Sequence, residues 1–235
     1  WAGFARRAEA LGYAAVYVTD HLGRGLSPIA AMASAAAATT TIRIGSYVFA
    51  NDFRHPLILA REAATLDRLS GGRLELGLGA GWMRSDYRQL GLPYDRPGLR
   101  IDRLQESFGL IRRLLSGEVV THAGRFYRLD RARAWPDTVQ RPHPPLMLAG
   151  GGPRQLRFAA REAQIVGLAP QMTPTGRPML RLATEEALAG RVELVRDAAG
   201  ARFDELELNV FVAEAGIVGS GQPVTSSVAA QAKSA

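Results

Sequence analysis

Short strand patterns alternate with helical patterns along almost the whole of this 235-residue chain. Such alternation, interrupted here by a single hairpin pattern, is typical of a mostly parallel sheet with right-handed crossovers. The pattern alone leaves open whether that sheet is a closed barrel or an open doubly wound sheet. The predicted strands cover six segments, namely Ala14–Thr19, Ile42–Phe49, Leu74–Gly79, Leu146–Ala149, Gln164–Leu168 and Leu206–Ala213.

Capping residues and turns place helices between these strands. Proline in the first turn predicts helices that begin at Pro28, Pro56 and Pro153. Other amphipathic stretches predict helices over Trp1–Ala10 and Leu99–Leu115, and one helix or a helix pair over Pro178–Ala199. The segment Val119–Leu129 has the pattern of a β-hairpin, which we expect to lie outside the main sheet.

The chain is long enough and apolar enough, at 47% hydrophobic residues, for one α/β domain with a sizeable core. We expect that domain to occupy residues 1–215. Residues 216–235 are rich in Gly, Ser, Ala and Gln and show no periodicity, so a disordered tail is predicted there.

Charge and cysteine content exclude several classes of function. The net charge of +7 comes almost wholly from arginine, because Lys233 is the single lysine. The arginines are spread along predicted helices and do not cluster with aromatic residues, so we expect an anionic small molecule as the partner rather than a nucleic acid. No apolar run approaches the roughly eighteen residues of a membrane span, and no secretory signal is recognisable. With no cysteine, disulfide scaffolds and thiol nucleophiles are excluded, and a cytoplasmic enzyme is the expectation.

The stretch Gly71–Trp82, GGRLELGLGAGW, reads as a turn, a buried strand and a glycine-rich strand end. Ligands of parallel α/β proteins bind at the carboxyl ends of strands, where Gly77, Gly79 and Gly81 would let a ligand approach. Their G-x-G-x-G spacing departs from the dinucleotide fingerprint G-x-G-x-x-G and follows the third strand instead of the first. A NAD(P)-dependent dehydrogenase is therefore the weaker alternative.

A second glycine cluster, Gly150-Gly151-Gly152-Pro153, lies between a predicted strand and a predicted helix. Backbone N–H groups at a helix start can bind phosphate, and glycines allow close approach. The alternative is a tight turn without a ligand. No Walker lysine is present, so a nucleoside triphosphate is not expected.

Asp20 and His21 end the first predicted strand, where the reactive side chains of barrels are found. Histidine there could act as a general acid or base, whereas a helix-capping Asp and a solvated His are the alternative. None of the four histidines has metal-ligand spacing to another, so no metal is predicted. On the next two strands Arg43 and Glu75 occupy comparable alternating positions, and we expect them to pair inside the sheet or barrel.

Three segments in combination resemble the bacterial luciferase-like monooxygenase superfamily, and within it the branch of deazaflavin (coenzyme F-420)-dependent oxidoreductases. The resemblance covers Trp1–Ala213 and is carried by GYAAVYVTDHL at Gly12–Leu22, by Ile42–Trp82 and by RPHPPLMLAGGG within Arg141–Pro170. It implies an α/β fold of the TIM-type (β/α)8 barrel, with the cofactor ring at the carboxyl ends of the strands. About six of the eight strands are present, so we expect an incomplete barrel.

The resemblance also implies roles for individual residues. His21 would be the proton donor or acceptor, and Asp20 would line the substrate side with it. Gly151 and Gly152 would receive the cofactor phosphate, and a non-proline cis peptide is expected at Tyr47-Val48. Trp82 stands where the sugar-phosphate dehydrogenase branch has a catalytic glutamate, which disfavours sugar-phosphate oxidation. The residues expected to support or approach the ring are Ser46, Tyr47, Val48, Asn51, Gly79, Gly81 and Trp82.

The function implied by the resemblance is oxidoreduction of a small organic substrate. Reduced deazaflavin would support hydride transfer, and reduced FMN with oxygen would support monooxygenation. A truncated, non-catalytic flavin-binding relative is the alternative, because two strands are missing from the pattern. Relatives of this kind are commonly dimers, so a homo-oligomer is expected.

Overall fold

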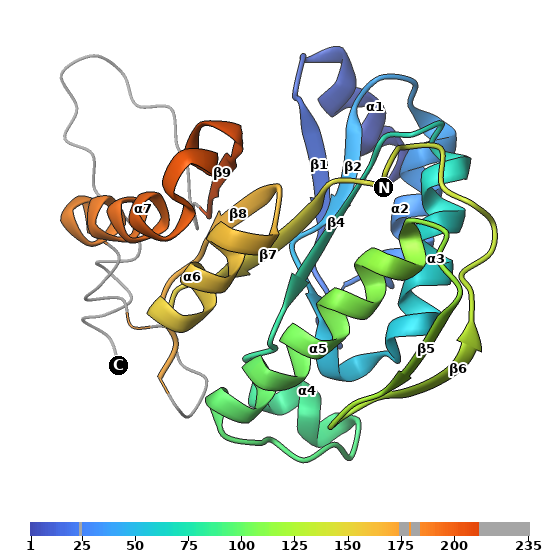
Figure 1. The fold of residues 1–235 in the computed structure, drawn as a ribbon. Coiled ribbons are helices and arrows are strands. Elements are labelled where there is room, and N and C mark those ends of the chain that lie inside the picture. Colours follow the sequence, from blue (N-terminus) through green and yellow to red (C-terminus); the bar gives the residue numbers. More distant parts are fainter. Residues whose placement is uncertain (24, 174–178, 180–183, 212–235) are drawn as a thin grey trace, which may run out of the picture.

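The computed structural model describes residues 1–23, 25–173, 179 and 184–211, and these form one curved parallel sheet with helices packed along it (Figure 1). Six strands follow one another across the sheet in the order β1-β2-β4-β7-β8-β9, and the short β3 pairs with β4 beyond the end of β2. The bounds of the strands are Ala15–Val18 (β1), Arg43–Ser46 (β2), Phe49–Ala50 (β3), Leu74–Gly79 (β4), Leu146–Gly150 (β7), Ile165–Leu168 (β8) and Glu207–Val210 (β9).

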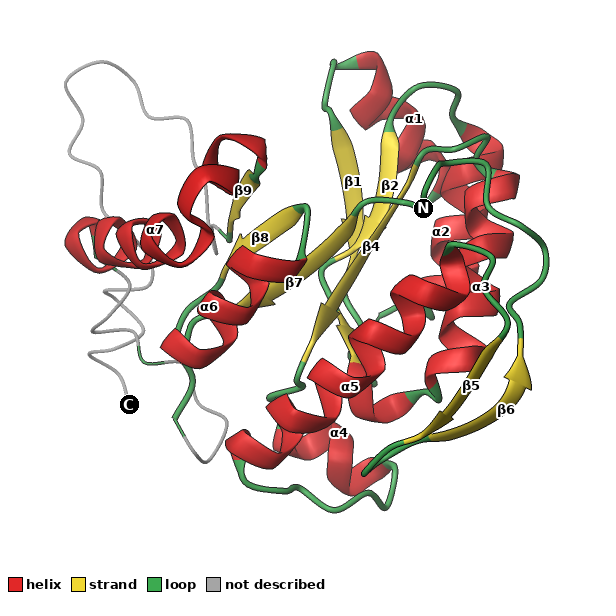
Figure 2. Cartoon of the chain, in the orientation of Figure 1, coloured by secondary structure: helices red, strands yellow, loops and turns green. Residues whose placement is uncertain are grey.

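The sheet curls as part of a barrel does, and within the described residues β1 and β9 form its two edges. Helices pack against one another in the order of the strands that they follow, as Figure 2 shows. This arrangement agrees with the predicted incomplete barrel and excludes the doubly wound sheet that the sequence pattern had left open. The helices are Ala2–Ala10 (α1), Pro28–Ala38 (α2), Pro56–Leu69 (α3), Arg84–Gln89 (α4), Pro97–Leu115 (α5), Pro153–Glu162 (α6) and Glu185–Ala199 (α7), with 3-10 turns at Asn51–Phe53 (η1) and Gly200–Glu205 (η3).

Proline and capping side chains fix where these helices begin. Proline occupies the first turn of α2, α3, α5 and α6, where its missing N–H would have no helical partner. The His55 side chain caps α3 by accepting a hydrogen bond from the Leu57 amide, and Thr184 caps α7 in the same way. The α7 helix occupies the later part of the predicted segment Pro178–Ala199 and begins at Glu185. Residues 174–178 and 180–183 lie outside the described residues.

The predicted hairpin forms a separate antiparallel pair, β5 (Val120–Ala123) and β6 (Arg128–Ala132). Glu106 of α5 attaches this hairpin to the domain. Its carboxylate accepts hydrogen bonds from the Phe126 and Tyr127 amides and lies 3.0 Å from His122 Nε2. The hairpin is therefore an excursion outside the main sheet, as expected.

The central strand β4 is buried along its whole length, including Glu75. Glu75 accepts hydrogen bonds from the Tyr17 hydroxyl and the Arg43 guanidinium, which confirms the predicted pairing of Arg43 with Glu75. Burial, and then the hydrogen bond to Glu75, raises the pKa of Tyr17 well above its ordinary value. Arg43 and Glu75 lie toward the amino ends of their strands, while the Tyr17 ring meets the Tyr47 ring edge-on, with 6.2 Å between the centroids.

One of the predicted strands is not continuous in the structure. Ile42–Phe49 was expected as one strand, but the structure divides it into β2 and β3 at a cis peptide between Tyr47 and Val48. The cis bond itself confirms the expectation drawn from the family resemblance. The predicted tail, residues 216–235, lies outside the described residues, and no helix within the described part has the length and hydropathy needed to cross a membrane.

Candidate functional site

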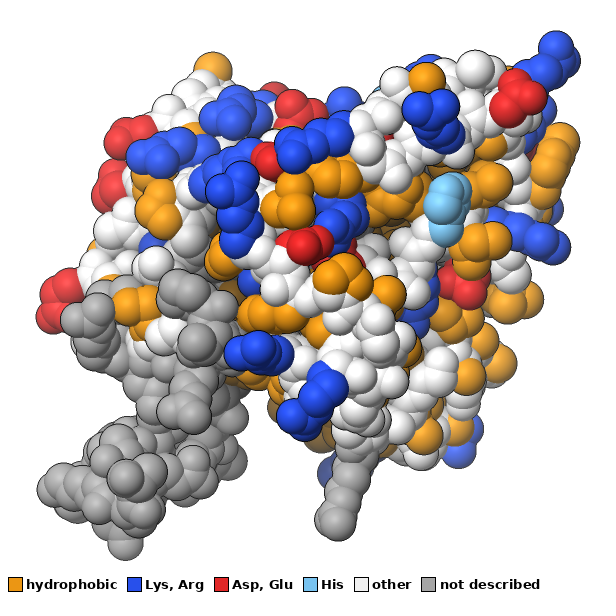
Figure 3. Space-filling model, turned by 90° about the horizontal axis from the view of Figure 1, so that it is seen from below, with side chains coloured by type: hydrophobic (Ala, Val, Ile, Leu, Met, Phe, Trp, Pro, Cys, Tyr) orange, Lys and Arg blue, Asp and Glu red, His pale blue; other side chains and the backbone are white. Residues whose placement is uncertain are grey.

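The carboxyl ends of the parallel strands meet at one edge of the sheet, which we call the carboxyl-end face. The loops that leave the strands there carry the predicted residues: Asp20 and His21 after β1, Tyr47 to Asn51 around β3, Gly79 to Trp82 after β4, and Gly150 to Gly152 after β7. In Figure 1 β4 runs downward, so Figure 3 looks onto this side of the molecule. Arginine side chains are scattered over it among hydrophobic and neutral groups.

His21 is held by two residues that follow β4. Its Nδ1 lies 2.8 Å from Oδ2 of Asp86, whose side chain is only 2% exposed. The Trp82 ring packs edge-on against the imidazole, with 5.4 Å between the ring centroids. About a third of the His21 side chain stays exposed. His21 is therefore oriented by protein on one side and open to a ligand on the other.

Asp20, beside His21 in sequence, has different surroundings. Its two carboxylate oxygens accept a bidentate pair from Arg54, at 2.6 and 3.0 Å, and one of them also accepts the Ala50 amide. These contacts join the end of β1 to the loop that holds Asn51. Asp20 thus fixes the position of that loop relative to the end of β1.

The cis peptide at Tyr47-Val48 turns Val48 toward β4, and the glycines of that strand accommodate it. A Cβ atom on Gly79 would lie 2.7 Å from a Val48 methyl, and one on Gly77 would overlap the Ser46 carbonyl oxygen. The Ser46 hydroxyl also exchanges hydrogen bonds with the backbone of Gly77. The first role of Gly77 and Gly79 is thus to leave room for the bulge that carries Val48. A ligand that approached these glycines would contact the Val48 side chain first.

Gly81 and Asn51 belong to a buried polar cluster at the same edge. Gly81 has φ +71°, and its Cβ position is filled by the Tyr87 hydroxyl. That hydroxyl lies 3.0 Å from Asp52 Oδ2, while Asn51 donates to the Tyr127 hydroxyl at 3.1 Å. Burial, and then the charge of Asp52, raises the pKa of Tyr87 above its ordinary value.

The second glycine cluster supplies two different environments. Gly151 is packed against the backbone of residues 169–171, so it has no room for a side chain. Gly152 is the N-cap of α6 and has no atom within 4 Å of its Cβ position. Next to this loop the Gln155 amide is buried, with no hydrogen-bond partner for either of its polar atoms. Gly152 is therefore the open part of the predicted phosphate loop.

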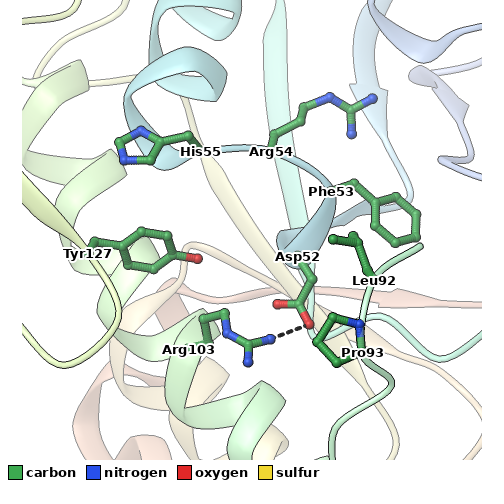
Figure 4. A pocket seen from close by; sticks show the side chains of 8 residues that line it. All are labelled: Asp52, Phe53, Arg54, His55, Leu92, Pro93, Arg103 and Tyr127. Atoms are coloured by element: carbon green, nitrogen blue, oxygen red, sulfur yellow. Dashed lines mark hydrogen bonds and ion pairs between the residues drawn. The ribbon is translucent and has the colours of Figure 1, made fainter. Parts of the chain in front are cut away.

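A pocket of about 370 Å³ adjoins these loops on the side of the hairpin (Figure 4). Arg103 donates to Asp52 at 2.6 Å there, and the Tyr127 hydroxyl points toward the same pair. None of the residues predicted to support or approach the ring lines it, so it is a neighbour of the candidate site and not the site itself. Its lining consists of Asp52, Phe53, Arg54, His55, Leu92, Pro93, Arg103 and Tyr127.

Sequence reasoning missed the residues that hold the predicted ones in place, Asp86, Arg54 and Tyr87. Asp86 pairs with a residue 65 positions away and Arg54 with one 34 positions away. No motif surrounds them. The one available signal was an acidic residue in the first turn of a short helix directly after the glycine strand.

Comparison with known proteins gives consistent matches. A family model described as luciferase-like monooxygenase matches residues 2–214. A coenzyme F-420-dependent glucose-6-phosphate dehydrogenase of Nakamurella multipartita is 32% identical over an alignment of 219 positions, which covers 88% of this chain and 60% of that protein. An uncharacterised protein of Mycobacterium tuberculosis is 33% identical over 173 residues, or 73% of this chain and 60% of that one.

Solved structures agree with the fold. The monooxygenase RslO1 of Streptomyces bottropensis superimposes with a TM-score of 0.73 at 30% identity, covering 85% of this chain and 59% of that one. The coenzyme F-420-dependent tetrahydromethanopterin reductase of Methanopyrus kandleri gives a TM-score of 0.75 at 24% identity, covering 89% and 60%. The chain thus spans about 60% of the length of the relatives that it matches.

Proposed function

The chain belongs to the luciferase-like monooxygenase family, and from this we propose that it is an oxidoreductase that binds a deazaflavin (coenzyme F-420) or FMN at the carboxyl-end face. The observation that carries the proposal is that His21, after β1, and the open glycine loop at Gly152, after β7, both lie at the carboxyl-end edge of one parallel sheet. Relatives and neighbours named for F-420-dependent and monooxygenase activities support the choice of cofactor.

The residues of this face fit a ring cofactor with a phosphate. Gly152 leaves open space at the N-terminal end of α6, where backbone N–H groups favour an anion. The Val48 side chain, seated over Gly79, offers an apolar support, and Asn51, Gly81 and Trp82 line the neighbouring loops. Ser46 holds the support in place through the Gly77 backbone, Tyr47 packs against Tyr17 and Phe211, and Gly151 lies in the loop after β7.

The bound cofactor would supply hydride or oxygen chemistry. The chain itself would orient the substrate and move a proton at His21, whose ring is oriented by Asp86 and Trp82. Asp20 would act indirectly, by fixing the loop of Asn51 through Arg54. We propose no metal in this chemistry.

We propose a small organic substrate other than a sugar phosphate. Several relatives are named glucose-6-phosphate dehydrogenases, but Trp82 stands here where we expect the catalytic glutamate of that branch. An indole can pack against a ring and donate one hydrogen bond, and it cannot take up or release a proton as a carboxyl does. The indole of Trp82 also favours an apolar surface beside His21, either of the substrate or of the cofactor ring.

Two alternatives stay open to experiment. A non-catalytic, flavin-binding relative would have the same face without turnover. A NAD(P)-dependent dehydrogenase has less support, because the Gly77–Gly81 stretch leads into the six-residue helix α4 instead of a long crossover helix. A cytoplasmic location stays a prediction made from composition.

The test is fluorescence titration of the purified chain with coenzyme F-420, FMN and NADPH. We expect saturable binding of F-420 or FMN, and a loss of at least tenfold in affinity for Gly152→Glu, which places a negative charge in the open phosphate position. Gly190→Glu is the matched control, since Gly190 lies within α7, also with open space at its Cβ position. Failure to bind either flavin-type cofactor would refute the proposal, and binding without turnover would favour the non-catalytic alternative.

We also propose that the chain self-associates. The supporting observation is a groove of about 290 Å³ between α2 and α3, beside the exposed side chains Ile58 and Leu69. Arg61 and Glu62 line the same groove and could pair across a two-fold axis. Light scattering on the wild type and on Ile58→Glu tests this, with a dimer expected only for the wild type.

A further inference from the structure

We infer that Asp86 is a positioning residue, which fixes His21 as the tautomer protonated at Nδ1 and leaves the Nε2 lone pair for the reacting molecule. The inference rests on the proposed role of His21 and adds a residue and a protonation state to it. It is carried by the contact of 2.8 Å between His21 Nδ1 and Asp86 Oδ2.

The chemistry of the pair decides which nitrogen carries the proton. An ionised carboxylate can only accept hydrogen bonds, and a neutral imidazole has one donor and one acceptor nitrogen. The nitrogen that contacts Asp86 must then be the donor, and the other must be the acceptor. Hydrogen atoms are not seen directly, so the tautomer follows from this pairing.

Burial makes the pairing obligatory for Asp86. The side chain is 2% exposed, and a buried carboxylate without a donor costs far more than a solvated one. Asp86 sits in the first turn of α4, next to the fully buried Tyr87, so the backbone fixes its position. The position of the Asp86 carboxylate is therefore fixed, and the His21 imidazole orients toward it.

Trp82 restricts the remaining freedom of the imidazole. Its ring meets the His21 ring at 83°, from the loop that leads from β4 to α4. A half-turn of the imidazole about its Cβ–Cγ bond would put Cδ2 in the place of Nδ1 and break the contact with Asp86. The exposed third of His21 is then left to meet a ligand at the carboxyl-end face.

The hairpin contains an internal reference with the opposite geometry. His122 contacts Glu106 through Nε2, at 3.0 Å, and Glu106 also holds the Phe126 and Tyr127 amides. By the same reasoning His122 is protonated at Nε2. The two histidine–carboxylate pairs among the described residues are therefore expected to show opposite tautomers.

The experiment is a long-range proton–nitrogen NMR spectrum of the full chain with ¹⁵N-labelled histidine, recorded at an alkaline pH at which the histidine nitrogen shifts no longer change with pH. The chain has four histidines, and His21→Gln and His122→Gln assign the two signals. We expect protonated Nδ1 for His21 and protonated Nε2 for His122. Protonated Nε2 at His21 in the wild type would overturn the inference.

Asp86→Ala then tests the cause. We expect His21 to change to the Nε2-protonated form while His122 is unaltered, and Glu106→Gln should leave His21 as in the wild type. An unchanged His21 tautomer in folded Asp86→Ala would overturn the positioning role; if that variant does not fold, the wild-type spectrum decides. No cofactor is present in these spectra, so a chain that failed to bind F-420 and FMN would refute the proposed function and leave this result independent.

Discussion

The two ends of the parallel sheet are both rich in polar side chains, but those side chains have different partners. At the amino end, the Arg73 guanidinium donates to the carbonyl oxygens of Ala36, Thr39 and Ile42. Asp67, fully buried at the end of α3, accepts from both amides of Val139 and Gln140. Each charge there is satisfied by protein.

At the carboxyl end, side chains that are hydrogen-bonded to protein lie beside positions that stay accessible to a ligand. Asp86 and Asp20 are buried and bound to protein, while His21 keeps an exposed edge and Gly152 an open Cβ position. The difference teaches that polarity alone does not mark a site. A site is marked by an accessible atom whose position is fixed by a buried, hydrogen-bonded neighbour.

This comparison predicts that substitutions at the amino end change stability alone, whereas those at open positions of the carboxyl end change ligand binding alone. The largest expected effect is that of Gly77→Ala, where the new methyl would overlap the Ser46 carbonyl oxygen. Backbone cannot move aside cheaply, so we expect a loss of about 3 kcal/mol in urea denaturation.

Gly152→Ala is the matched control, because the added methyl meets no atom within 4 Å and the φ of −86° suits any residue. Its stability should equal that of the wild type, and its affinity for the cofactor should fall. Equal stability of the two variants would contradict the distinction between a packed and an open glycine.

Asp67→Ala is expected to have the next largest effect, about 2–3 kcal/mol, since it removes the charged acceptor of the Val139 and Gln140 amides and of the Gln140 side chain. Cofactor affinity should be unaltered. Asp86→Ala, which removes one hydrogen bond to a side chain that water can reach, should cost about 1 kcal/mol or less. Comparable losses of stability in Asp67→Ala and Asp86→Ala would show that the two buried aspartates contribute equally to stability.

Asp20→Asn is the strongest test of the comparison between the two ends of the sheet. Asp20 lies at the carboxyl end, but both of its carboxylate oxygens are hydrogen-bonded to protein. Asparagine cannot accept the bidentate contact of Arg54, so a loss of about 1–2 kcal/mol is expected. The loop of Asn51 should loosen with it and weaken cofactor binding by about tenfold, equivalent to 1.4 kcal/mol. A stability loss with unchanged binding would assign Asp20 to the structural class.

The sequence predicted the six strands and the start of α3 because their signals are local: apolar periodicity, and proline in the first turn at Pro56. It could not predict the division of the second strand, since residues 42–49 keep a strand pattern through Tyr47 and Val48. That feature came only from the family resemblance. Asp86 and Arg54 escaped because their partners are distant in sequence, and a lone acid or arginine has no pattern of its own.

The smallest expected effect belongs to Glu9, an exposed carboxylate of α1 that caps the turn before β2. Its Oε1 accepts the amides of Thr40, Thr41 and Ile42, and these backbone hydrogen bonds lower the pKa of Glu9 to about 2. A folded-state pKa below the unfolded one adds stability that is complete at neutral pH and is lost as the pH falls toward about 2. Glu9→Gln should therefore lower the midpoint of urea denaturation at pH 7 by a small amount, and by less at pH 3, with cofactor affinity unaltered. A difference that is the same at both pH values would mean that the charge of Glu9 contributes nothing and that its hydrogen-bond geometry alone supports this end of the sheet.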